Sequence, residues 1–142
     1  MIVRPWRKGD NDFELQDRQA YLKLAQDPAT LDLSALSAEG LAWTGEVDGK
    51  IVGVAGVIPQ WSNRAIAWAM IAKDAGPHFV SIHREVRKFL IHCPFVRVEA
   101  QVDVGFPEAN RWMTMLGFEL EGYMRAFRPD GADMLLYARV RR

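Results

Sequence analysis

The last third of the chain constrains the fold most, because it reads as a strand, a helix and a hairpin in direct succession. Residues 95–103 read as a buried strand, and residues 107–116 carry apolar side chains at helical spacing. Gly117 suits the left-handed residue that commonly ends a helix. A hairpin follows over residues 120–140, around the turn at 129–131. This order predicts an α/β domain.

The N-terminal part predicts one strand and two helices. Residues 1–6 form a short strand, and Asp10 or Asn11 then caps a helix that ends before Asp27-Pro28. Leucines within residues 31–36 predict a second, short helix, which ends at Gly40.

The middle of the chain predicts the centre of the sheet. Asp48-Gly49 favours a two-residue type I′ turn, so residues 41–47 and 51–58 form a hairpin. Residues 66–71 are apolar on both faces, as in a central strand. Residues 78–92 have the apolar spacing of a long helix. The strands on either side of that helix are therefore expected to be parallel neighbours.

Bulk composition limits the class of protein. A length of 142 residues suits one domain, spanning 1–142. Lys and Arg together number 18 and balance 18 Asp and Glu, so no net field favours nucleic acid or an anionic membrane. Cys93 is the only cysteine, and no apolar run approaches the roughly 20 residues that span a bilayer. We expect a cytoplasmic protein without nucleic-acid or membrane partners.

The full order, β-α-α-β-β-β-α-β-α-β-β, resembles the GNAT superfamily of N-acetyltransferases over nearly the whole chain. The most specific match runs from Arg111-Trp112 to Leu116-Gly117-Phe118-Glu119, and residues 43–53 look like the central hairpin of that superfamily. A narrower resemblance is to small proteins of tailed phages and prophages, including the internal virion protein family of T7-like phages. The superfamily resemblance implies a single-domain acyl-CoA N-acyltransferase-like fold, with a mixed, mostly antiparallel sheet and helices on both faces.

The same resemblance implies acetyl-CoA as co-substrate and an amine acceptor, either a small molecule or a protein. The coenzyme would lie in a gap between the strands near 66–72 and 96–102, with its pyrophosphate at the start of the main helix. Backbone N–H groups near Ile71 or Ala72 would polarise the thioester carbonyl. The cofactor-binding positions carried over are Ile71, Ala72, Lys73, Gly76, His78 and Phe79.

Several residues that perform chemistry in the superfamily are replaced. In the phosphate loop, Gly76 is the only glycine, Pro77 removes an N–H donor and Asp74 adds a negative charge. Met113 stands where a tyrosine acts as general acid, and the usual asparagine position falls on Phe106, with Asn110 shifted from it.

These replacements keep two other hypotheses open. One is a catalytically inactive phage or prophage structural or assembly protein, virion-associated through phage structural partners, that uses the fold as a scaffold. The other is a pseudoenzyme that binds acyl-CoA as a sensor. Both differ from the enzyme hypothesis in predicting no turnover.

Candidate catalytic groups are few. The candidate general bases are Asp103, Glu46 and Glu99, which lie on predicted strands. Asp103 ends a parallel strand, where open α/β sheets bind ligands, although an aspartate there also commonly caps the next turn. Trp61, before the central strand, is the candidate to line the acceptor side. The three histidines, His78, His83 and His92, lie five and nine residues apart, which does not predict a metal site. The edge of the final hairpin could pair with a second copy to form a homodimer.

Overall fold

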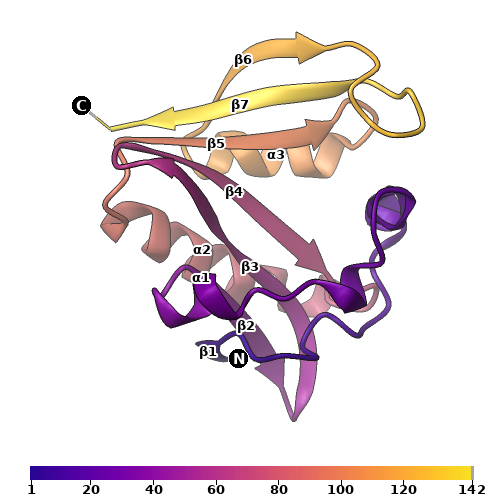
Figure 1. Ribbon diagram of the computed structural model, residues 1–142, viewed down its shortest axis with the longest axis vertical. Coiled ribbons are helices and arrows are strands. Elements are labelled where there is room, and N and C mark those ends of the chain that lie inside the picture. Colours follow the sequence, from indigo (N-terminus) through magenta and orange to yellow (C-terminus); the bar gives the residue numbers. More distant parts are fainter. Residues whose placement is uncertain (142) are drawn as a thin grey trace.

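The computed structural model describes residues 1–141, which form a seven-stranded sheet in the order β1-β2-β3-β4-β5-β7-β6. In the described chain, β4 and β5 are the one parallel pair, and every other neighbouring pair is antiparallel. This confirms the mixed, mostly antiparallel sheet (Figure 1). The strands are β1 (Ile2–Pro5), β2 (Ala42–Val47), β3 (Lys50–Trp61), β4 (Arg64–Ile71), β5 (Arg97–Asp103), β6 (Glu119–Met124) and β7 (Met134–Val140).

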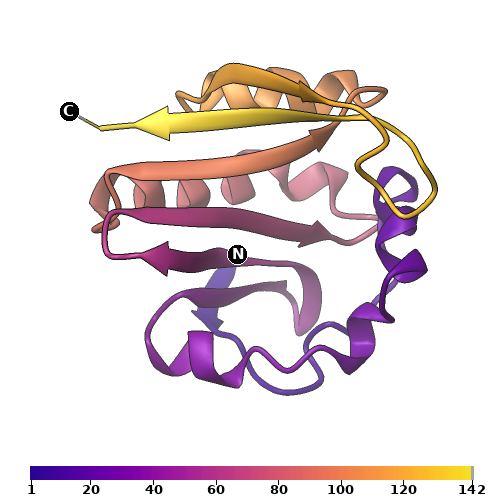
Figure 2. The ribbon, with the colours of Figure 1, turned by 45° about the horizontal axis from the view of Figure 1, so that its top comes forward.

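Helices cover both faces of the sheet, as the resemblance implied. The two longest α-helices pack on one face, while the N-terminal 3₁₀ turns and a short α-helix pack against the other face of β2, β3 and β4 (Figures 1 and 2). The helical elements are η1 (Asp17–Leu24), η2 (Pro28–Thr30), α1 (Ser34–Ala38), η3 (Gly76–His78), α2 (Phe79–His92) and α3 (Pro107–Met115), of which the η elements are 3₁₀ helices. None of the helices in residues 1–141 is long and apolar enough to cross a membrane.

Two turns show how the local sequence sets the path of the chain. Asp48 and Gly49 both have positive φ angles, of 51° and 79°, as a type I′ turn requires, and they join β2 to β3. Gly117 has a φ of 87° directly after α3, where a residue with a Cβ would be strained. Both turns were predicted, and both are confirmed.

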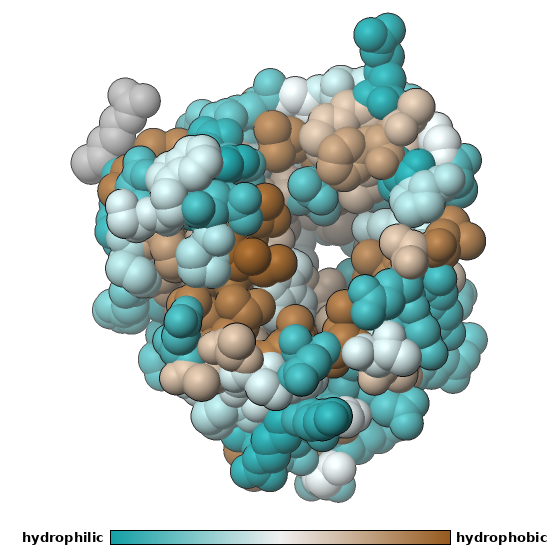
Figure 3. All heavy atoms as spheres, viewed as in Figure 1, coloured by the Kyte–Doolittle hydropathy of each residue, from teal (hydrophilic) through white to brown (hydrophobic). Residues whose placement is uncertain are grey.

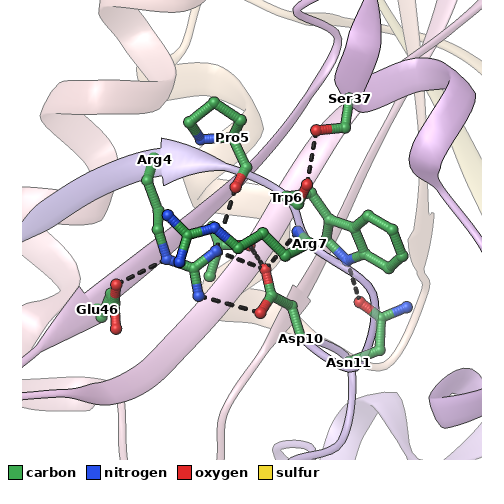
Figure 4. Close-up of polar contacts among 9 residues, drawn as sticks. Arg4, Pro5, Trp6, Arg7, Asp10, Asn11, Ser37 and Glu46 are labelled. Atoms are coloured by element: carbon green, nitrogen blue, oxygen red, sulfur yellow. Dashed lines mark hydrogen bonds and ion pairs between the residues drawn. The ribbon is translucent and has the colours of Figure 1, made fainter.

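The predicted N-terminal helix begins too early. Asp10 and Asn11 do not cap it, because both are buried and bind distant groups instead. Asp10 accepts hydrogen bonds from Arg4 and from the Thr44 hydroxyl, while Asn11 accepts one from the Trp6 indole (Figure 4). The helical segment starts only at Asp17 and is a 3₁₀ helix. Contacts made across the fold therefore overrode a local capping signal.

The main core lies between the sheet and the pair α2 and α3. Ala65 of β4, Val98 of β5 and Tyr137 of β7 are buried there against Leu90 and Met113 of the two helices. This shared core fixes where α2 begins relative to the ends of β4 and β5, and so it positions the site described next.

Candidate active site

The central strands β4 and β5 pair over only part of their length. Their register joins Arg64 to Arg97, Ala65 to Val98 and Ile66 to Glu99, and no pairing between the two strands continues beyond these three positions. Residues 67–71 leave β5, while β5 itself stays paired with β7 as far as Asp103. Figure 1 shows the two strands diverging as a V. Beyond Ile66, this edge of β4 therefore has no neighbouring strand in the middle of the sheet.

A cleft of about 930 Å³ occupies the region where the strands part. Its walls are mostly apolar, and a space-filling view shows apolar side chains around a hollow between the two halves of the molecule (Figure 3). Contributions come from both parted strands and from the two helices behind them, including Ala67, Ala69, Ala100, Phe79, Val86 and Trp112. Phe79 and Trp112 meet edge to face, with ring centroids 5.4 Å apart.

Ion pairs hold the closed end of the V together. The buried carboxylate of Glu99 on β5 binds Arg64 on β4, with one bond of 2.9 Å to Oε1, and Arg97 at 2.8 Å. Arg97 continues to Glu121 on β6 at 2.6 Å. The hydrogen bonds from Arg64 lower the pKa of Glu99 to about 2, against the opposing effect of burial and with further help from Arg97.

A side chain from η1 occupies the open end. Gln19 Nε2 donates to the carbonyl oxygen of Ala69 at 2.7 Å, and the Ile71 N–H donates to Gln19 Oε1 at 2.8 Å. The Ala72 N–H donates to the Val52 carbonyl at 3.0 Å and so points toward β3. Of the two N–H groups predicted to polarise a thioester, only that of Ile71 faces the side from which β5 has departed.

The start of α2 carries no side-chain cap and no acidic residue in its first turn. The N–H of Phe79, the first residue of α2, donates to the Gly76 carbonyl in the preceding 3₁₀ turn, so the backbone of that turn partly replaces a side-chain cap. Gly76 in the preceding turn has no atom within 4 Å of where a Cβ would stand, so the approach is open. Asp74, whose charge argued against an anion here, is paired with Lys50. The loop is thus more favourable to an anion than its sequence suggested.

Only some of the cofactor-binding positions predicted around this loop line the cleft. Phe79 and Gly76 line it, whereas Lys73, His78 and Ala72 are not among its lining residues. The Lys73 ammonium is exposed and lies 3.4 Å from Glu14 and 3.8 Å from Asp17.

Asp103 lies at the carboxyl end of β5 and lines the cleft. One of its oxygens accepts the Gly105 N–H at 2.8 Å, and the other lies 2.9 Å from Arg128. A second pocket, of about 440 Å³, opens beside it and shares Arg18, Tyr21 and Asp103 with the cleft. The Tyr21 ring stacks under Arg128, with the guanidinium carbon 4.1 Å from the ring centroid, and burial raises the pKa of Tyr21.

The fold places Glu46 and Trp61 away from the cleft. Glu46 lies on β2 and accepts a 2.7 Å bond from Arg4, within the ion-pair group that also holds Asp10 (Figure 4). Trp61 is exposed at the β3–β4 turn, under Arg64, next to the closed end of the V. Neither residue is among those that line the cleft.

Asn110 and Trp112 make further polar contacts beside the cleft, whose partners the sequence does not indicate. Asn110 donates to the carbonyl of Asp103 at 3.1 Å and accepts the Tyr137 hydroxyl at 2.7 Å, so it ties α3 to β5 and β7. Trp112 donates its indole N–H to His83 Nδ1 at 3.0 Å. Among residues 1–141, no group of three His, Cys, Asp or Glu side chains is arranged to hold a metal ion.

The fold matches solved N-acetyltransferase structures. The chain is 15% identical to a GNAT superfamily phosphinothricin acetyltransferase from Sinorhizobium meliloti in complex with acetyl-CoA, with a TM-score of 0.73 over 98% of this chain and 87% of that one. It is 14% identical to a ribosomal-protein-alanine N-acetyltransferase from Brucella melitensis, with a TM-score of 0.66 over 99% of both chains.

A variant of the spermidine N-acetyltransferase of Vibrio cholerae is also similar, with 14% identity and a TM-score of 0.66 over 99% of this chain and 95% of that one. No protein-family model matches the sequence, and no curated protein matches it. At these identities the likeness establishes the acyl-CoA N-acyltransferase-like fold. The activity has to be argued from the residues of the cleft.

Proposed function

We propose that the protein is an acetyl-CoA-dependent N-acetyltransferase that transfers an acetyl group to an amine by direct attack. The observation that carries this proposal is the separation of β4 from β5 after three paired positions, beside an apolar cleft of about 930 Å³. A parted pair of strands in the middle of a sheet exposes main-chain donors and acceptors to a ligand. Solved structures of the same fold hold acetyl-CoA.

The pantetheine arm is an extended chain with amide groups, so it suits the free edge of β4. It would lie between residues 67–71 and the carboxyl half of β5, with its aliphatic parts against Ala67, Ala100 and Val86. The pyrophosphate would lie at the N-terminus of α2, where no side chain caps the helix and the helix dipole supplies a partial positive charge. Gly76 leaves room there, and Lys73 and His78 are the side chains of the loop proposed to contact the phosphates.

The acceptor amine would enter through the second pocket, next to Asp103 and Tyr21. Its nitrogen attacks the thioester carbon, the C–N bond forms and the C–S bond breaks, and the coenzyme leaves as a thiolate. Asp103 is the carboxylate placed to take the proton that the amine loses, directly or through water. Glu46 is not proposed for this role, because it does not line the cleft, whereas Asp103 does. A thiolate is a stable leaving group, so Met113 in the usual tyrosine position does not prevent the reaction.

Isothermal titration calorimetry with acetyl-CoA tests this proposal. We expect a dissociation constant in the micromolar range and, with a panel of amines, release of free thiol. An absence of both heat and thermal shift at millimolar acetyl-CoA would remove the proposal. Binding without thiol release from any amine would instead favour an acyl-CoA sensor.

The non-enzymatic alternative, a phage or prophage assembly protein, draws on the replaced residues Pro77 and Met113. It predicts no coenzyme binding, so the same titration separates it from the enzyme. A homodimer is a further proposal, since β6 is an edge strand with exposed Leu120 and Tyr123. A cytoplasmic location accompanies the enzyme proposal, because acetyl-CoA would have to reach the cleft.

A further inference from the structure

The free edge of β4 is already paired with a side chain of this chain. Gln19 uses its amide N–H to reach the Ala69 carbonyl at 2.7 Å and its amide oxygen to accept the Ile71 N–H at 2.8 Å. A carboxamide carries a donor and an acceptor side by side, as a peptide group does. Gln19 therefore binds the edge as one peptide unit of an added strand would.

The neighbouring backbone extends this pairing. The Gln16 N–H donates to the Ile71 carbonyl at 2.9 Å, and the Lys73 N–H donates to the Glu14 carbonyl at 2.9 Å. The Gln16 side chain donates to Gln19 Oε1 at 3.0 Å and so steadies the carboxamide. Residues 14–16 thus form an isolated antiparallel bridge, Leu15 with Ala72, at the end of β4, and the Gln19 side chain extends the contact back to Ala69.

We infer that Gln19 is an internal competitor for acetyl-CoA, and that the coenzyme must displace its carboxamide from Ala69 and Ile71. This inference rests on the proposed function. The N–H of Ile71 points in one direction and is already engaged, so a ligand amide or thioester oxygen cannot use it while Gln19 stays in place. Gln19 would then set the affinity of the cleft without taking part in the chemistry.

The segment that carries Gln19 is suited to moving away. η1 contains no fully buried residue, although it runs for eight residues and its Leu22 is partly buried against the core. A 3₁₀ helix of that length is unusual, because its hydrogen bonds have poor geometry. Segments with few buried contacts open locally at low cost. Displacing the carboxamide would therefore require only a local rearrangement, while the sheet stays intact.

Calorimetry on two substitutions of Gln19 tests the inference. Gln19→Ala removes the carboxamide, and Gln19→Met removes both hydrogen bonds but keeps the length of the side chain. Gln26→Ala is the matched control, since Gln26 is exposed and bonds only to Thr30 in its own turn. We expect both Gln19 variants to bind acetyl-CoA about tenfold more tightly than the unsubstituted protein, since two hydrogen bonds no longer have to be broken. The control should bind with unchanged affinity.

The outcomes separate this inference from the proposed function. Equal or weaker binding by the Gln19 variants, with clear binding by the unsubstituted protein, would overturn the competition and leave the acetyltransferase proposal standing. No binding by any of the proteins would overturn both.

Amide hydrogen exchange examines the bridge without any coenzyme. The Ile71 amide should lose protection in both Gln19 variants, while the Ala72 amide, bonded to Val52, should keep its protection. Unchanged protection at Ile71 would show that Gln19 does not hold this edge and would overturn the inference.

Discussion

The two ends of the β4–β5 pair are closed by different chemistry. At the end where the strands meet, Glu99 joins Arg64 to Arg97 through charged side chains that are mostly buried. At the end where they part, the neutral carboxamide of Gln19 and the backbone of Gln16 cover the edge of β4. The charged junction is made by residues of the sheet strands. The neutral junction is made by Gln19 of η1 and by Gln16 directly before it.

This difference in chemistry indicates how readily each end of the strand pair opens. Opening the charged junction would separate Arg64 on β4 from the buried carboxylate of Glu99 on β5, so this end resists opening. Breaking the neutral junction exposes groups that water or a ligand can satisfy. This arrangement suits a pair of strands that stays closed at one end and binds a ligand at the other.

The largest expected effect comes from breaking the closed end. Glu99→Gln leaves Arg64 and Arg97 beside each other without their shared carboxylate, and we expect it to lower the free energy of unfolding by about 2–3 kcal/mol. Urea denaturation measures this loss. Glu121→Gln, which removes the more exposed carboxylate of the same network, is the control and should lose less than about 1 kcal/mol. Equal losses from the two variants would contradict the special role of Glu99.

The same ion pairs of Glu99 make the free energy of unfolding depend on pH. The folded pKa of Glu99 is lowered from 4.5 to about 2, so its contribution is complete above pH 4.5 and is lost as the pH falls from there toward 2. The loss is on the order of 2 kcal/mol, after allowance for the partly exposed arginines. Denaturation midpoints from pH 6 to 2 should fall less steeply for Glu99→Gln than for the unsubstituted protein. Parallel curves would show that Glu99 does not supply this dependence.

Filling the open end should block the ligand and spare the fold. Ala69→Leu adds bulk to the wall of the cleft, and we expect acetyl-CoA binding to weaken by roughly 10- to 100-fold. Ala35→Leu makes the same change on the exposed face of α1 and should bind as the unsubstituted protein does. Calorimetry compares the two. Undiminished binding by Ala69→Leu would mean that the ligand lies elsewhere.

A smaller effect should come from charge at the start of α2. Gly76→Asp puts a carboxylate where the pyrophosphate would lie, in open space, so the fold should be unaffected. We expect acetyl-CoA to bind about tenfold more weakly, while S-acetylpantetheine, which has no phosphate, binds as before. Competition titrations with both ligands measure the difference. If both ligands lose affinity equally, the phosphate is not at α2.

Local signals in the sequence were sufficient for most of the fold. Asp48-Gly49 specified its hairpin and Gly117 specified the end of α3, because each requirement is a property of one or two residues. The prediction that Asp10 or Asn11 caps the first helix was wrong, because each binds a partner far away in the sequence. Asp10 binds Thr44, and Asn11 binds the Pro28 carbonyl. A capping preference is too weak to compete with such buried contacts.

The site was less predictable than the fold. Asp103, Ile71 and Gly76, which line the cleft, were predicted from their places at strand ends and in the loop before α2, and their roles remain predictions. Gln19 was missed because it meets Ala69 across 50 positions of sequence, and a single glutamine leaves no periodic or spacing signal. Side-chain contacts between distant segments depend on the assembled fold.

The proposed activity requires that acetyl-CoA enter between β4 and β5. Amide hydrogen exchange along both strands, with and without saturating acetyl-CoA, tests this directly. We predict changed protection in residues 67–71 of β4, the open half, with none in residues 64–66, which are already paired with β5. Unchanged protection throughout residues 64–71, or changes confined to residues 64–66, would contradict binding of acetyl-CoA between β4 and β5.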